Sequence, residues 1–153
     1  MDNPQVSPAH RQLHSLAGNW VGQEKIYPSP WHPHGAAAVG KVKNKAALDG
    51  LAVVQHYEQE MGGTVVFRGH GIFTFDGAAD QHMLYWFDSV SQVPSIFRGG
   101  FTGNLLTLAS QSPQGHVRAS WDVTLPEAYS YRMDVSGDGK QWVPLMEAEY
   151  RLI

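Results

Sequence analysis

The chain contains no cysteine, which excludes disulfide bridges, cysteine-ligated zinc, iron–sulfur clusters and thiol nucleophiles. Charged residues are also scarce: they make up 16% of the 153 residues, and the formal net charge is -3. The eleven basic residues are scattered along the sequence and form no cluster. Binding to nucleic acid or to an anionic membrane surface requires clustered positive charge, so we expect neither partner.

Long apolar runs are absent as well. No stretch approaches the roughly 18 residues that a membrane span requires, and the chain does not begin with a basic segment followed by an apolar one. We therefore expect a cytoplasmic protein with no membrane partner. A length of 153 residues with 42% hydrophobic residues is typical of one domain, here residues 1–153 with residues 1–6 flexible.

Helix signals are confined to one segment, residues 7–17. Ser7 can cap this helix, Pro8 suits its first turn, and Gly18 ends it. The rest of the chain alternates between apolar and polar residues and is interrupted by turn residues, which predicts about ten strands. They are residues 19–27, 37–48, 51–60, 64–76, 81–89, 95–101, 105–110, 116–125, 129–135 and 141–152.

The connections between these strands are short and rich in glycine, asparagine and aspartate, so consecutive strands should be antiparallel neighbours. Ten meandering strands would leave exposed edges unless the sheet closes on itself. The sequence therefore predicts an all-β fold, an up-and-down antiparallel β-barrel of about ten strands with a lumen and a short N-terminal helix. A sandwich of two sheets is the alternative.

Tight turns predict which side chains face the inside of such a barrel. A two-residue loop at Asp49-Gly50 places Lys41 opposite Glu58. Their face must be the solvent face, because charged side chains remain hydrated. The opposite face then lines the lumen. Continuing this register across Gly62-Gly63, and assuming a three-residue loop within residues 76–80, predicts a ligand-binding lumen formed by Asn44, Gln55, Tyr57, Arg68, His70 and Trp86.

The same register leaves many aromatic residues on the outer face, more than a monomer normally exposes. We therefore expect a homodimer. These residues are Phe67, Phe73, Phe75, Tyr85 and Phe87.

Several short motifs resemble known barrel families. Gly18, Trp20 and Gly22 resemble the Gly-x-Trp-x-Gly opening of calycin-type barrels, in which the tryptophan closes one end. A closer resemblance, over nearly the whole chain, is to the bacterial lipocalin-like domain-of-unknown-function family 1579. The motifs that carry it are Gly18 to Glu24, Tyr27-Pro28, Gly69 to Gly71, Trp86 to Ser89, and Asp138 to Trp142. This family implies a fold without a settled activity.

A more distant resemblance is to nitrobindin-like barrels, which bind haem through a histidine near the C-terminal strands. This sequence has Glu24 where that family has a third glycine, and no histidine follows His116. Haem is therefore a minor alternative, and we otherwise expect no cofactor.

Two histidines in the segment "YPSPWHPHG" suggest a metal site, because His32 and His34 are two residues apart. Three prolines favour an extended polyproline conformation there, which turns the two imidazoles away from each other. We favour a stiff flap over the barrel mouth, with Trp31 touching the ligand.

These observations leave three functional hypotheses. The first is a barrel that binds a hydrophobic or aromatic molecule, with or without an anionic group that Arg68 would meet. The second is a small isomerase, cyclase or hydrolase with His70 as the catalytic acid or base. The third is a haem- or metal-binding barrel.

Overall fold

A short helical segment precedes the first strand in the computed structural model, which describes residues 4–153. It comprises α1 (Pro8–Leu13) and a 3₁₀ turn, η1 (His14–Leu16). The Ser7 side chain caps α1 by accepting a hydrogen bond from the His10 amide, as the sequence predicts. The predicted flexible segment, residues 1–6, lies in part outside the described residues.

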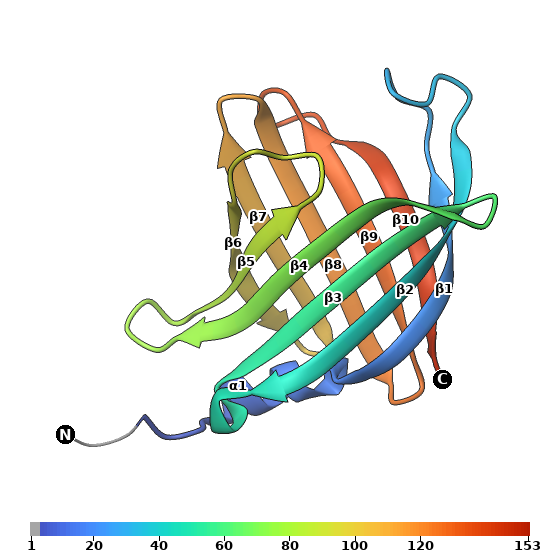
Figure 1. The fold of residues 1–153 in the computed structure, drawn as a ribbon. Coiled ribbons are helices and arrows are strands. Elements are labelled where there is room, and N and C mark those ends of the chain that lie inside the picture. The colour runs from blue at the N-terminus through green and yellow to red at the C-terminus, as the bar shows by residue number, and fades with distance from the viewer. Residues whose placement is uncertain (1–3) are drawn as a thin grey trace.

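Ten antiparallel strands follow and confirm the predicted all-β fold with its short N-terminal helix (Figure 1). The last strand pairs with the first, so the sheet closes into a barrel and the alternative of a two-sheet sandwich is wrong. A second 3₁₀ turn, η2 (Leu48–Gly50), joins two of the strands. The strands are β1 (Gly18–Ile26), β2 (Ala36–Ala47), β3 (Ala52–Met61), β4 (Thr64–Asp76), β5 (Gln81–Asp88), β6 (Ser95–Thr102), β7 (Leu105–Ser112), β8 (Gly115–Leu125), β9 (Ala128–Ser136) and β10 (Val143–Leu152).

The two ends of the barrel differ. Figure 1 shows α1 at one end, whereas the loop between β1 and β2 projects from the other. At the α1 end, Leu13, Leu16 and Trp20 are buried, and the Trp20 indole donates a hydrogen bond to the Leu16 carbonyl at 2.9 Å. The expectation that this tryptophan closes one end of the barrel is confirmed. No helix within residues 4–153 is long and apolar enough to cross a bilayer.

The register between β2 and β3 agrees with the prediction. Lys41 lies opposite Glu58, and Asn44 lies opposite Gln55. Between β3 and β4 the pairing shifts, because Gln59 pairs with Phe67 while the next residue, Glu60, pairs with Val65. The extra residue on β4 is a β-bulge, and a shift of one residue turns every later side chain of that strand to the opposite face.

Candidate functional site

The interior of the barrel holds a cavity of about 430 Å³. Its walls are mainly aromatic and aliphatic, and residues of the β1–β2 loop (residues 27–35) and the β5–β6 loop (residues 89–94) lie at its mouth. Binding sites for small molecules are typically of this size, with apolar walls and a few polar groups. The aromatic lining consists of Trp31, Tyr57, Phe67, Trp86, Phe97, Trp121, Tyr129, Tyr131 and Tyr150.

A carboxylate lies buried behind the wall of this cavity. Glu24 is 2% exposed and projects from β1 into the barrel interior. Its Oε2 accepts hydrogen bonds from the Tyr57 hydroxyl at 2.6 Å and from the Tyr150 hydroxyl. Its Oε1 accepts one from Gln59 Nε2 at 3.0 Å. Three donors on two strands, β3 and β10, therefore satisfy the carboxylate, as a buried charge requires.

Close packing explains a glycine beside this group. A Cβ at Gly40 on β2 would collide with the Glu24 carboxylate and with the Tyr150 ring. Glycine at this position therefore makes the space that Glu24 occupies.

Burial keeps the tyrosines of this region protonated. Desolvation is the main cause that raises the pKa of Tyr57, Tyr129, Tyr131 and Tyr150 well above the ordinary value near 10, and the charge of Glu24 adds to it. Protonated hydroxyls of Tyr57 and Tyr150 can donate to Glu24, so the raised pKa values agree with the hydrogen-bond geometry.

Trp86 projects from β5 into the barrel, and its ring packs against the inner face of β4. A Cβ at Gly69 or Gly71 would meet the Trp86 ring, so these two glycines leave the space that the indole fills. Its Nε1 donates to Asp88 Oδ2 at 2.9 Å, and Asp88 Oδ1 accepts from the amides of Val90 and Ser91. The Gly69 to Gly71 motif therefore accommodates a tryptophan ring.

Of the predicted lumen residues, Gln55, Tyr57 and Trp86 line the cavity, and Trp31 lies at its mouth. Asn44 also faces inward, but at the closed end, where its amide donates to the Leu16 carbonyl at 2.8 Å. It does not line the cavity, so this part of the prediction is wrong.

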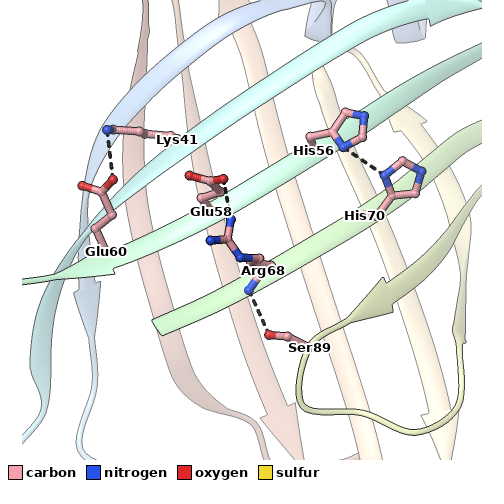
Figure 2. Close-up of polar contacts among 7 residues, drawn as sticks. All are labelled: Lys41, His56, Glu58, Glu60, Arg68, His70 and Ser89. Atoms are coloured by element: carbon pink, nitrogen blue, oxygen red, sulfur yellow. Dashed lines mark hydrogen bonds and ion pairs between the residues drawn. The ribbon is translucent and has the colours of Figure 1, made fainter. Parts of the chain in front are cut away.

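The predicted inward positions of Arg68 and His70 are also wrong. Both side chains lie on the outer face of β4 (Figure 2). Arg68 forms an ion pair with Glu58 at 2.6 Å, and His70 Nδ1 lies 3.1 Å from His56 Nδ1. The bulge at Val66 is the physical reason, because it turns Arg68 and His70 outward and the intervening glycines inward.

The predicted three-residue loop within residues 76–80 is wrong as well. Asp76 pairs with Gln81, which leaves a loop of four residues. This second shift of one residue offsets the first, so Trp86 still points inward as predicted, opposite Gly71 and not opposite His70.

The aromatic outer face is smaller than predicted. Phe67 lines the cavity, Phe73 is fully buried, and Phe75 packs edge-on against His10 of α1. Their predicted outward positions are wrong for the same reason as that of Arg68. Tyr85 and Phe87 do lie exposed on the outer face of β5, where the homodimer stays a prediction.

The two histidines of the β1–β2 loop are placed differently. His32 lines the mouth of the cavity, and its amide and carbonyl form hydrogen bonds with Ser29. His34 does not line the cavity. Within residues 4–153 no group of three or more histidine, aspartate or glutamate side chains is arranged to hold a metal ion.

The residues present do not fit the haem site of nitrobindin-like barrels. That site uses a histidine near the C-terminal strands, whereas His116 on β8 packs against Trp142 and against Gly139 in the loop between β9 and β10. His116 does not line the cavity. His32, on a loop, is the one histidine among the described residues of the cavity wall.

The sequence prediction missed Glu24, Gln59 and Tyr150. An available signal was the alternation along β1: if Trp20 closes the barrel from inside, then Gly22 and Glu24 face inward too. No comparable signal identified Tyr150, since its inward direction depends on pairing between the first strand and the last.

Comparison with protein families gives a match over residues 5–152 to the family described as "Protein of unknown function (DUF1579)". The chain belongs to this family. The resemblance inferred from the sequence motifs is thereby confirmed. Comparison with curated proteins gives no match.

Two solved structures share the fold of this DUF1579 barrel. Rv2717c from M. tuberculosis has a TM-score of 0.72 and 15% sequence identity, with 97% of this chain and 99% of that chain covered. The S-type phycobiliprotein lyase CPES from Guillardia theta has a TM-score of 0.61 and 8% identity, with 97% of each chain covered. At these identities the likeness concerns the fold alone.

Proposed function

We propose that this barrel binds a small molecule with an aromatic or apolar body inside its lumen. The observation that carries the proposal is the cavity of about 430 Å³, walled by aromatic side chains and open between two loops. Such a cavity differs from a packed core, in which side chains fill the available space. Gln55, Tyr57, Trp86 and Trp31 are the proposed ligand contacts.

Binding is better supported than catalysis. One structural neighbour is named a lyase, so the fold is compatible with either role. The proposed acid or base, His70, lies outside the barrel, and both oxygens of Glu24 are occupied by hydrogen-bond donors. The anionic ligand group expected from an inward Arg68 also loses its partner, since Arg68 pairs with Glu58.

A fluorescence titration tests this proposal. The neutral aromatic dye N-phenyl-1-naphthylamine should bind saturably with one molecule per chain and brighten as it enters the apolar lumen. Native mass spectrometry of the freshly purified protein should show co-purified small molecules at the same stoichiometry.

A matched pair of variants locates the binding. Val117→Trp places a large ring in the cavity wall, whereas Val66→Trp makes the same change at an exposed position. We expect dye affinity to fall at least about tenfold in the first variant and to change less than about twofold in the second. Equal affinities in the two variants would place the dye outside the lumen and contradict the proposal.

A further inference from the structure

The charges around the lumen indicate which ligands it selects. Building on the proposed binding function, we propose that the lumen prefers molecules that carry a protonated amine on an aromatic or apolar body. The proposal rests on two carboxylates without basic partners, on hydrogen-bond donors already committed to one of them, and on aromatic rings beside the other.

Two acidic groups flank the cavity and no basic group balances them. Asp88 lines its mouth, and Glu24 lies behind the hydroxyls of Tyr57 and Tyr150. Among the described residues, the cavity wall contains no lysine or arginine, and the five ion pairs involve neither Glu24 nor Asp88. A carboxylate buried without a counter-charge is costly, so a cationic ligand would supply the missing charge.

The polar groups around Glu24 suit a ligand that donates hydrogen bonds. Tyr57 and Tyr150 direct their hydroxyl protons to Glu24, and Gln59 directs its amide protons to Glu24 and Tyr57. The Tyr150 oxygen and the Gln59 carbonyl therefore retain acceptor capacity toward the lumen. An ammonium group needs such acceptors, whereas a carboxylate ligand would find no cation.

Gln55 is one of the polar side chains of the wall that make no hydrogen bond within residues 4–153. Gln55 is 6% exposed, lines the cavity, and its amide makes no side-chain hydrogen bond there. Among the described residues only Asn44 Oδ1 is fully buried without a partner, so the Gln55 amide is accessible from the lumen and free to bond a ligand group. Gln55 can accept from an amine through its carbonyl oxygen.

Aromatic rings stand beside the acidic group at the mouth. The Trp86 indole is hydrogen-bonded to Asp88, and its ring centroid lies 6.4 Å from that of Tyr57. Faces of tryptophan and tyrosine attract cations, most strongly where water is excluded. An ammonium entering past Asp88 would therefore meet first a carboxylate and then two aromatic rings.

Three probes with the same ring test this preference: 2-naphthylmethylammonium, 2-naphthalenemethanol and 2-naphthoate. In calorimetric titrations of the full chain we expect the ammonium to bind at least about tenfold more tightly than the alcohol, and the carboxylate to bind most weakly. An alcohol that binds as tightly as the ammonium, or a carboxylate that binds more tightly, would overturn the proposal.

The neutral dye separates this proposal from the binding function on which it rests. If the dye binds and the ammonium shows no advantage over the alcohol, the charge preference is wrong while the binding function stands. If neither the dye nor any naphthyl probe binds, both proposals fail.

Variants that replace one carboxylate by an amide test which residues cause the preference for an ammonium ligand. Asp88→Asn keeps an oxygen for the amides of Val90 and Ser91, and Glu24→Gln keeps one for the tyrosine hydroxyls. Each should weaken ammonium binding about tenfold and change binding of the alcohol less than about twofold. Glu58→Gln, which removes a carboxylate from the outer face, should change neither. Equal weakening of both probes by the inner variants would indicate a merely structural role and overturn the proposal.

Discussion

The hairpin of strands β3 and β4 has a carboxylate on each of its faces. The carboxylate on the inner face is buried, whereas the one on the outer face is exposed to solvent. On the inner face, Tyr57 and Gln59 hold the carboxylate of Glu24, which is 2% exposed. On the outer face, Glu58 pairs with Arg68 (Figure 2). These two side chains are 44% and 62% exposed. Because water screens the outer pair and not the inner cluster, we expect the two carboxylates to contribute very differently to stability.

The largest effect should come from Glu24→Ala. This change leaves two tyrosine hydroxyls and one amide without their acceptor inside the barrel. We expect a loss of roughly 3–5 kcal/mol in the free energy of unfolding, measured by urea denaturation. The matched outer change, Glu58→Ala, should cost no more than about 1 kcal/mol.

The rescue variant Glu24→Gln sharpens this comparison. A glutamine can still accept from the hydroxyls, and rotation of the Gln59 amide lets it accept from the new side chain. It should recover more than half of the lost stability. A loss for Glu24→Ala as small as that for Glu58→Ala would show that the inner cluster is not worth more than the exposed pair.

A somewhat smaller effect is expected from Gly69→Ala on the inner face of β4. The added methyl group would collide with the Trp86 ring and force the indole out of its position. We expect a loss of about 1–3 kcal/mol in the free energy of unfolding, together with a shift in tryptophan fluorescence. The neighbouring outer change His70→Ala is the control and should leave the fluorescence unchanged.

Ionisation of the buried tyrosines at high pH tests whether the inner face excludes water. Burial raises the pKa of Tyr57, Tyr129, Tyr131 and Tyr150 in the folded barrel, whereas in the unfolded chain these groups ionise near pH 10. The stability that this difference provides is complete below about pH 10 and is lost as the pH rises further, because the unfolded state then releases protons that the folded state retains.

An ultraviolet titration of tyrosinate absorbance measures this. We expect four of the six tyrosines to ionise only together with unfolding, which circular dichroism reports in parallel. If all six ionise gradually while the circular dichroism signal stays native, the cluster is open to hydroxide and the inner face is not as dry as the structure indicates.

The fold could be predicted from the sequence because each of its signals is local. Alternating residues, tight turns and the Gly18 to Gly22 opening lie within short stretches, and each predicts a strand, a hairpin or a barrel end without distant contacts. The register between β2 and β3 was predicted correctly for the same reason, since one turn determines it.

The site was predicted less well because it depends on irregularities that have no clear sequence signal. One extra residue at Val66 exchanges the two faces of β4, so Arg68 and His70 lie outside while Phe67 lies inside. Nothing in the stretch "TVVFRGHG" distinguishes a regular strand from a bulged one. Gln55 and Tyr57 precede the bulge along the chain, and their predicted positions were unaffected by it.

The smallest effects should come from the outer residues that the sequence had placed in the site. Arg68→Ala removes one member of an exposed ion pair, and His70→Ala removes one ring of an exposed histidine pair. We expect each to change the free energy of unfolding by less than about 1 kcal/mol and the affinity for the neutral dye by less than about twofold. Tyr57→Phe is the control on the inner face, because it removes a hydroxyl that donates to Glu24 beside the lumen. It should lower the free energy of unfolding more than Arg68→Ala or His70→Ala does. A large loss of dye binding in His70→Ala alone would return that histidine to the site and contradict the register described for β4.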